Sequence, residues 1–371
     1  MICIQNVHVY APEDLGVCDI LIVNDKIAEI GPNLSLFLPE KTEVIDGTGK
    51  IAIPGLIDQH VHITGGGGES GFASKIHEIT MSECVSNGVT SVVGLLGTDS
   101  VTRSVENLVS KVKGLRQEGM SAWCLTGGYE YPSVNICGSV SRDISFIEEV
   151  LGVKLAISDH RCSYPTVEEL IRLTSQVRIA SLLAKKPGVV HLHTGRGKAG
   201  LTDILEVLDR TDIPVWHFRP THITHQPGAD EFAARGGYID VTTGADTEER
   251  QEDILYWMEH AQSEHLTLSS DANGSMPIWG EDKELIGMGV SSVSSLFRTV
   301  RALIWNHHIP VEQALAPVTA NVAKALNLYP RKGHLATGSD ADVILMNEDW
   351  QIEQVYAMGK TDWKDFYSLE K

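Results

Sequence analysis

The hydrophobic positions of this chain follow two different patterns. Over the first fifty residues, apolar and polar side chains alternate in short steps, as in VCDILIVNDKIAEIG and TEVIDGTGKIAIPG, with turn residues such as Asn24-Asp25 between them. The same pattern returns near the C-terminus in GSDADVILMN and IEQVYAMGK. Because short predicted strands at both ends flank a long segment with a different hydrophobic pattern, we expect a small β-sandwich domain built from residues 1–52 and 325–371.

Residues 53–324 follow the second pattern. Eight apolar runs of strand length recur there, and most are separated by stretches with apolar spacings of three and four residues, such as TVEELIRLTSQVRIASLLAKK. Eight β-α units in succession predict an α/β fold of the TIM (β/α)8 barrel type. A doubly wound sheet is the alternative, but no GxGxxG motif follows the first strand. The runs are IPGLID (53–58), GVTSVVGLL (88–96), SAWCLTGGY (121–129), GVKLAIS (152–158), GVVHLHTG (188–195), PVWHFRPTH (214–222), YIDVTTG (238–244) and LTLSSDAN (266–273).

Charge, cysteine content and the absence of long apolar runs narrow the classes of protein to which this chain can belong. The formal net charge of -19 disfavours binding to nucleic acid or to an anionic membrane. The six cysteines form no CxxC pair, which is typical of reduced cytosolic thiols. The first residues, MICIQNVHVY, lack the features of a signal peptide, and no apolar run is long enough to span a bilayer. We therefore expect a soluble, cytoplasmic protein.

One residue does not fit its strand. Lys154 lies within GVKLAIS, among side chains that indicate a buried strand. Burying an ammonium group costs several kcal/mol unless the group is paired or chemically changed. An ion pair with Asp159 or a side chain that reaches solvent at the strand end would each be an ordinary explanation.

Residues of metal-ligand type stand near the ends of several predicted strands, where TIM barrels place their chemistry. His60 and His62 follow the first run, and side chains at i and i+2 of an extended segment point the same way. Each such residue by itself is more often structural, and His191 and His217 lie in the same runs without an evident role. The joint pattern indicates a metal site. It consists of His60, His62, Lys154, His193, His222 and Asp271.

This ordered set resembles the amidohydrolase superfamily in its two-metal form. The segments PGLIDQHVHITGGGGESG, GVTSVVGLLGTD, GVKLAISDHR and SSDANGSMP resemble the isoaspartyl dipeptidase family in particular, and the similarity extends over essentially the whole chain. The resemblance implies a metallo-dipeptidase that cleaves the β-aspartyl bond of small isoaspartyl dipeptides, and a homo-oligomer.

The resemblance also implies the ligand roles. His60, His62 and Asp271 would bind one divalent metal ion, and His193 and His222 a second. Lys154 would react with CO2 to become N6-carboxylysine and bridge both ions, which replaces a cation beside two cations by an anion. Zinc is the expected metal, since imidazole and carboxylate ligands suit it.

In the mechanism that the resemblance implies, a metal-bridging hydroxide attacks the scissile carbonyl. Asp271 acts first as general base and then as general acid towards the leaving amine. Tyr129 would donate to the developing oxyanion. The matching substrate positions are Glu69 for the ammonium group, Gly67 and Thr98 lining the same pocket, and Arg161 and Ser275 for carboxylates.

One position departs from the family pattern. His225 stands where the family has a second carboxylate-binding arginine, and a neutral imidazole offers one donor instead of a charged fork. Nearby Arg219 is a candidate substitute. Because of this departure, an alternative function remains open: a related amidohydrolase that acts on a cyclic amide or an N-acyl amino acid. A non-catalytic relative of the barrel is the third interpretation, although all six metal positions are filled here.

Overall fold

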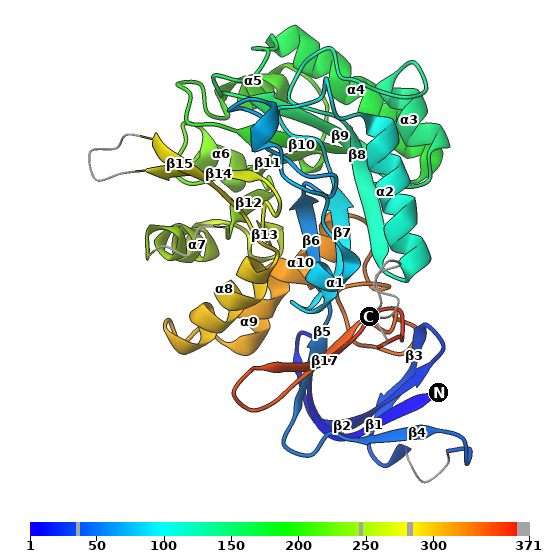
Figure 1. Cartoon of the computed structure of the whole chain (residues 1–371). Coiled ribbons are helices and arrows are strands. Elements are labelled where there is room, and N and C mark those ends of the chain that lie inside the picture. The colour runs from blue at the N-terminus through cyan, green and yellow to red at the C-terminus, as the bar shows by residue number, and fades with distance from the viewer. Residues whose placement is uncertain (35–37, 245–247, 280–284, 362–371) are drawn as a thin grey trace.

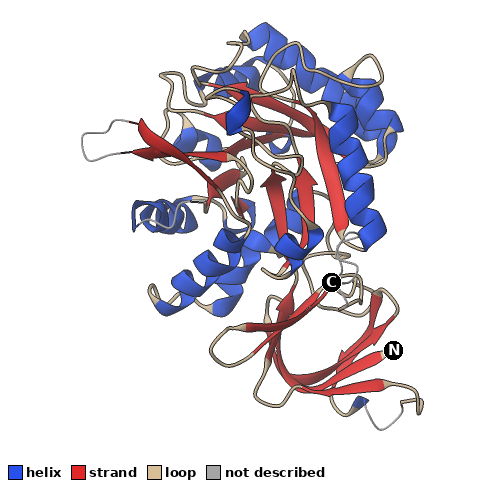
Figure 2. Cartoon of the chain, viewed as in Figure 1, coloured by secondary structure: helices blue, strands red, loops and turns tan. Residues whose placement is uncertain are grey.

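The computed structural model describes residues 1–34, 38–244, 248–279 and 285–361 (Figure 1). A barrel of strands with outer helices lies above a smaller, strongly curved sheet, as Figure 2 shows. Each of the eight predicted runs overlaps one barrel strand, and the predicted fold class is confirmed. The barrel strands are β6 (Leu56–Val61), β7 (Val89–Gly94), β8 (Ser121–Gly127), β9 (Val150–Ile157), β10 (Val189–Thr194), β11 (Phe218–Thr221), β12 (Ile239–Thr242) and β13 (Leu266–Ser269).

The barrel consists of parallel strands in chain order. Hydrogen-bonded ladders join β6 through β11, and β12 pairs with β13. Two backbone hydrogen bonds link these two groups of strands. Ile223 N donates to Asp240 O at 3.1 Å, and His62 N donates to Ala272 O at 2.9 Å. The second bond joins the first strand to the last, so the chain segments that carry His62 and Asp271 become neighbours.

The first predicted run is divided between the two parts of the molecule. Its beginning belongs to β5 (Ile51–Pro54) of the small sheet, and its remainder starts β6 of the barrel. Gly55 lies at the division, where a Cβ atom would collide with the side chain of Thr90. Only glycine lets the chain pass this close to β7 as it enters the barrel.

Helices cover the outside of the barrel and pack their apolar faces on the strands. Two of them begin with a capping box, from Thr80 and Glu83 and from Thr166 and Glu169. No helix of the described residues is both long and apolar enough to cross a membrane. The helices are α1 (Met81–Val85), α2 (Val105–Glu118), α3 (Val140–Phe146), α4 (Val167–Ala184), α5 (Thr202–Arg210), α6 (Ala229–Ala234), α7 (Glu248–His260), α8 (Ser294–Trp305), α9 (Val311–Leu315) and α10 (Ala320–Ala325). A hairpin, β14 (Ser275–Trp279) and β15 (Leu285–Val290), follows β13.

The small sheet takes strands from both ends of the chain, in the order β17-β16-β5-β1-β2-β3 with β4 beside β1. Its own core joins side chains from both ends, among them Ile20 and Val343. The exact division at residues 1–52, 53–324 and 325–371 stays a prediction, and residues 362–371 lie outside the described part. The strands are β1 (Ile2–Tyr10), β2 (Asp14–Val23), β3 (Lys26–Gly31), β4 (Glu43–Asp46), β16 (Val343–Met346) and β17 (Ile352–Tyr356).

Candidate metal centre and substrate pocket

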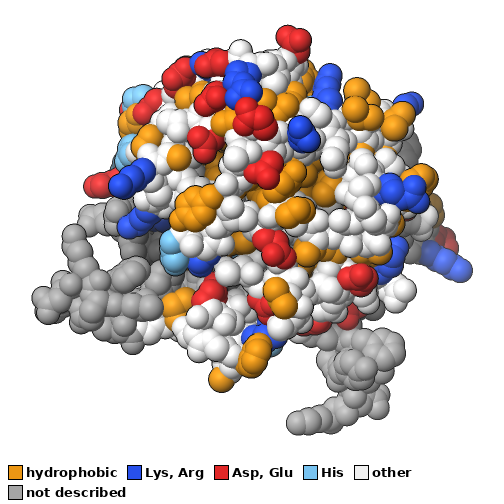
Figure 3. All heavy atoms as spheres, turned by 90° about the horizontal axis from the view of Figure 1, so that it is seen from above, with side chains coloured by type: hydrophobic (Ala, Val, Ile, Leu, Met, Phe, Trp, Pro, Cys, Tyr) orange, Lys and Arg blue, Asp and Glu red, His pale blue; other side chains and the backbone are white. Residues whose placement is uncertain are grey.

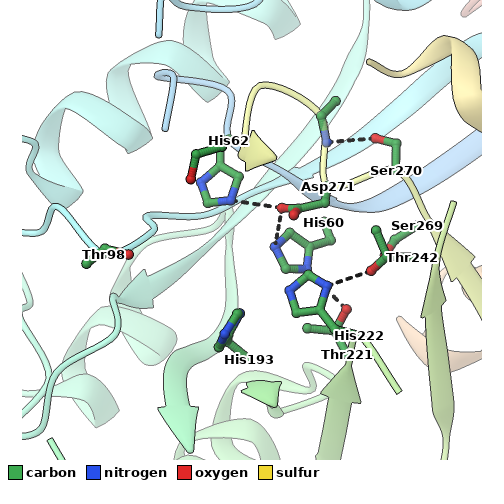
Figure 4. A network of polar contacts seen from close by, with 12 residues as sticks. His60, His62, Thr98, His193, Thr221, His222, Thr242, Ser269, Ser270 and Asp271 are labelled. Carbon is green, nitrogen blue, oxygen red and sulfur yellow. Dashed lines mark hydrogen bonds and ion pairs between the residues drawn. The ribbon is translucent and has the colours of Figure 1, made fainter. Parts of the chain in front are cut away.

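Two histidines, one in the first barrel strand and one directly after it, face an aspartate that follows the last barrel strand. His60 Nε2 lies 3.1 Å and His62 Nε2 lies 3.0 Å from Asp271 Oδ1. Asp271 has a positive φ of 54°, a conformation that turns the chain sharply after β13. Figure 4 shows both imidazoles directed at this carboxylate. Ligand atoms of His60, His222 and Asp271 all lie within 4.8 Å of one another, a spacing that suits the ligands of a metal centre.

The other two predicted histidine ligands continue this cluster around the rim. The ring centres of His60 and His222 are 5.1 Å apart, and those of His222 and His193 are 4.7 Å apart. His193 lies in β10, and His222 follows β11 with a φ of 61°. His222 Nδ1 contacts Thr242 Oγ1 at 2.6 Å. The structure therefore brings the four predicted histidines and Asp271 together at the C-terminal end of the barrel.

Lys154 is fully buried in β9, and its Nζ atom has no hydrogen-bond partner among the described residues. Burial lowers the pKa of this amine to about 7, although Asp271 and Asp240 oppose the shift. The ion pair with Asp159, one of the two ordinary explanations, is wrong because Asp159 binds Arg161 and His193 instead. The other, a side chain that reaches solvent, is wrong because Lys154 is 0% exposed.

The donor atoms of this cluster fit divalent metal ions. Burial, aided by the positive charge of Lys154, lowers the pKa of His60 to about 3, and burial lowers that of His193 to about 4, so both imidazoles are neutral. Neutral imidazoles and a carboxylate are the ligands that zinc and similar ions prefer. Lys154 Nζ is a buried polar atom without a partner among the described residues. Buried polar groups are normally satisfied, so this unpaired amine beside the histidine cluster indicates a bound group.

Tyr129 lies against the same cluster from the end of β8. Its hydroxyl is 2.7 Å from His193 Nδ1, and the Lys154 Nζ atom is 5.8 Å from its ring centre. Burial raises the pKa of Tyr129 well above its usual value, so the hydroxyl keeps its proton at neutral pH. The group is therefore a hydrogen-bond donor directed into the site.

The predicted substrate residues also gather at one place. Glu69 Oε1 accepts hydrogen bonds from Thr98 Oγ1 at 3.1 Å, from Ser275 Oγ at 3.0 Å and from Arg161 Nη1 at 3.3 Å. Gly67 precedes Glu69 with a φ of 74°, and a Cβ atom there would collide with the carbonyl oxygen of Ser74. One acid and three donors from four separate segments of the chain therefore meet beside the histidine cluster.

Asp159 has a structural role that the sequence analysis did not assign. Its Oδ2 atom accepts hydrogen bonds from His193 Nε2 at 2.9 Å and from Arg161 Nη2 at 3.0 Å. Burial by itself would raise the pKa of Asp159, yet these hydrogen bonds hold it well below its usual range. Asp159 thus orients one imidazole and one guanidinium at once. The signal in the sequence was an aspartate directly after a buried strand, in AISDHR.

His191, for which the sequence suggested no role, supports His60. His191 Nε2 lies 3.0 Å from His60 Nδ1, and Thr221 Oγ1 lies 3.3 Å from the same atom. Thr221 in turn donates to Asp240 at 2.7 Å. These contacts hold the far side of the His60 ring and leave its Nε2 atom directed at Asp271.

His225 and Arg219, the two residues considered for the second carboxylate contact, lie in different surroundings. His225 is 59% exposed, lies 3.6 Å from Asp253 Oδ1 and packs edge-on against Tyr256. Arg219 does not replace a second arginine, because it lies at the opposite end of β11 and donates to backbone carbonyls of Trp216, Phe218 and Ala325. The suggestion that Arg219 substitutes is wrong.

The face above this cluster has a mixed surface. Seen from above in Figure 3, acidic, basic and exposed apolar side chains are interspersed. Phe72, Val101 and Tyr164 are among the exposed large apolar residues. In this view, neither acidic nor basic side chains dominate the surface.

Comparisons with known proteins agree with this geometry. The family model described as the amidohydrolase family matches residues 51–362. A beta-aspartyl dipeptidase of Fervidobacterium islandicum AW-1, solved in complex with a beta-Asp-Leu dipeptide, is 38% identical, and the match covers 100% of this chain and 98% of that chain with a TM-score of 0.90. The resemblance to the amidohydrolases, and to the isoaspartyl dipeptidases among them, is thereby confirmed.

More distant relatives show the breadth of the family. The L-hydantoinase of Paenarthrobacter aurescens is 21% identical over 100% of this chain and 89% of its own length. The imidazolonepropionase of Rhizobium rhizogenes is 22% identical over 90% of this chain and 87% of its own length. A solved D-hydantoinase, 17% identical with a TM-score of 0.71 over 98% of this chain and 95% of that chain, shares the fold. The chain belongs to the amidohydrolase family and is a hydrolase.

Proposed function

We propose that this hydrolase is a metal-dependent dipeptidase that cleaves the β-aspartyl bond of isoaspartyl dipeptides. The observation that carries the proposal is the group formed by Glu69, Thr98, Arg161 and Ser275 beside the histidine cluster. It offers an acceptor for an ammonium group and donors for carboxylates within one hydrogen-bonded group of side chains, and a β-aspartyl dipeptide has both kinds of group. The full-length similarity to a beta-aspartyl dipeptidase supports the same substrate class.

The proposed ligands are those that the resemblance implies: His60, His62 and Asp271 for one ion, and His193 and His222 for the other. When bound, two divalent ions, for which we propose zinc, would supply Lewis acidity and lower the pKa of a water molecule towards ~7. We further propose that Lys154 is carboxylated. The neutral amine adds to the carbon of CO2, an N–C bond forms and one proton leaves to water. The product is an anion with two oxygen atoms, which suits a position between two cations.

The side chains of the chain then have distinct tasks. Asp271 takes a proton at its carboxylate and gives it to the leaving amine. Tyr129 donates its hydroxyl hydrogen to the substrate oxygen as negative charge develops there. Glu69 binds the ammonium group, Gly67 and Thr98 line this part of the pocket, and Arg161 and Ser275 bind a carboxylate.

We propose that substrate displaces the contact between Arg161 and Glu69 when it binds. At 3.3 Å it is longer than the contacts of Arg161 with Asp159, which are 2.9 and 3.0 Å. A substrate that brings one ammonium and one carboxylate group can replace this contact by two ion pairs. Asp159 would keep the guanidinium in place during the exchange.

The test is release of amino acids from β-Asp-Leu and from α-Asp-Leu by protein loaded with zinc and bicarbonate, with Lys154→Ala beside it. We expect hydrolysis of the β isomer only, and none in the variant. Bound metal, measured on the same samples, separates an inactive protein from an unloaded one. Hydrolysis of neither dipeptide by metal-loaded protein would refute the proposal.

A second candidate is hydrolysis of another amide, either a cyclic amide or an N-acyl amino acid. The observation in its favour is His225, which faces Asp253 and Tyr256 and brings no fixed positive charge to the expected second carboxylate position. Loss of hydantoin or dihydroorotate, whose ring opening frees no amino acid, and release of amino acids from N-acetyl amino acids distinguish the two candidates. Homo-oligomerisation and cytoplasmic location stay predictions.

A further inference from the structure

A second polar cavity lies at the opposite end of the barrel from the histidine cluster. Its lining comes from α4 and from the segments that lead into β10, β11 and β12, together with the end of α10. Its volume is about 450 Å³, within the usual size range of small-molecule sites. It contains five Lys and Arg side chains and no Asp or Glu: Arg178, Lys185, Lys186, Arg219 and Lys324.

Four of these five cations have no carboxylate partner among the described residues. Lys186 Nζ donates to three backbone carbonyls at 2.6–2.9 Å, and Lys324 alone has an ion pair, with Glu264 at 2.9 Å. In a chain with a formal net charge of -19, carboxylates are abundant elsewhere. A local excess of positive charge of this kind indicates a site for an anion that comes from outside the chain.

Arg178 is held in place for such a contact. His217 Nδ1 donates to the carbonyl oxygen of Gly188 at 2.7 Å, so its Nε2 atom is free to accept a hydrogen bond from Arg178 Nη1 at 3.1 Å. The guanidinium also lies 5.9 Å from the ring centre of Trp216. His217, a histidine without a role at the metal centre, thus orients a cation at this cavity.

Arg219 adds a second, independent observation. It is 2% exposed, and its Nε atom is buried without a hydrogen-bond partner among the described residues. Its guanidinium lies 3.6 Å from the ring centre of Tyr238. A buried guanidinium nitrogen without a hydrogen-bond partner is costly, and an anion in the cavity that Arg219 lines would reduce that cost.

We propose that this cavity binds a small phosphorylated metabolite. Arginine presents a planar fork that suits phosphate oxygens, and the cavity is larger than a single phosphate group. Trp216 is 51% exposed at its edge and offers an aromatic face for the remainder of the ligand. The site is independent of the proposed dipeptidase activity.

The experiment titrates the full-length protein with ADP, pyrophosphate and adenosine, using calorimetry and tryptophan fluorescence. ADP and pyrophosphate should bind, adenosine should not, and binding should weaken as ionic strength rises. Arg178→Gln and Lys185→Gln should each weaken ADP binding about tenfold, which corresponds to ~1.4 kcal/mol. Trp216→Phe should remove the fluorescence change.

The matched control is Arg172→Ala, an exposed arginine of α4 outside the cavity lining. It should bind ADP as the unchanged protein does. Adenosine that binds as well as ADP, no binding of either phosphate compound, or equal ADP affinity in Arg178→Gln and Arg172→Ala would overturn the proposal. Circular dichroism of each variant shows that a lost affinity does not come from misfolding.

Discussion

The two parts of the molecule each bury a lysine, and the two lysines have opposite surroundings. In the small β domain, Lys332 Nζ lies 2.8 Å from Asp340 and 2.6 Å from Asp342. In the barrel, Lys154 Nζ has no hydrogen-bond partner among the described residues. The first is a structural ion pair. The second is an amine without a hydrogen-bond partner beside the predicted metal ligands, and its proposed carboxylation would account for the burial.

Substitution of Lys154 should have the largest effect on activity. In Lys154→Met we expect kcat/KM for β-Asp-Leu to fall by about 10³-fold or more, or ~4 kcal/mol of transition-state stabilisation. The free energy of unfolding of the metal-free protein should stay equal or rise, because an unpaired buried amine is replaced by an apolar side chain. Kinetics and urea unfolding in chelator measure the two effects. A large loss of stability would show that the amine has a stabilising partner.

Substitution of Lys332 should reverse this pattern. Lys332→Met removes the cation from buried Asp342 and leaves Asp340 with Lys26 as its main cation, and we expect the free energy of unfolding to fall by about 3–5 kcal/mol. Activity per folded molecule should stay unchanged. Lys324→Met, which removes a partly exposed ion pair, is the control and should cost less than about 1 kcal/mol. Equal stability of the two variants would contradict the comparison.

The stability difference caused by Lys332→Met should also depend on pH. Burial would raise the pKa of Asp340, but Lys332 and Lys26 hold it below its usual value. A carboxylate with a lowered native pKa contributes stability above its unfolded pKa of ~3.9 and loses it as pH falls through the native value. The deficit of the variant should therefore be full at neutral pH and shrink below about pH 4. Urea unfolding at several pH values measures it, and a deficit that grows in acid would exclude this ion pair as the cause.

Substitution of Asp159 should have an intermediate effect, because this acid accepts hydrogen bonds from His193 and Arg161. Asp159→Asn removes the charge that orients His193 and Arg161, and we expect kcat/KM to fall by about 10- to 100-fold, as for other groups that orient metal ligands. Metal content after dialysis should fall with it. Asp203→Asn, which removes an acid nearby in the fold on α5, serves as the control. Unchanged activity in Asp159→Asn would show that His193 is held by other contacts.

The smallest effect should come from His225. In His225→Arg we expect the KM for β-Asp-Leu to fall by less than about tenfold with little change in kcat, because a half-exposed charge adds substrate binding without touching the reacting atoms. Steady-state kinetics with β-Asp-Leu measures the split. A higher KM in the variant would show that His225 does not face the substrate.

Much of the fold could be predicted because its signal is local. Alternation at both ends and eight apolar runs between them reflect side-chain burial within each segment, and each run overlaps one barrel strand. The division of the first run at Gly55 was missed, because it depends on the close approach of Thr90, a contact between distant segments. Likewise, Asp159 was considered as a partner for Lys154, since adjacency along the chain does not reveal which way a side chain points.

By itself, the sequence determined the periodicity of the strands, the types of side chain at their ends and the unusual lysine in a buried run. Only the tertiary structure decided which of these side chains share an environment. Barrel closure brings His62 beside Asp271, and the packing of β9 leaves Lys154 without a partner among the described residues while Asp159 binds His193. The physical reason is that burial is encoded residue by residue, whereas pairing between side chains depends on distances set by the whole fold.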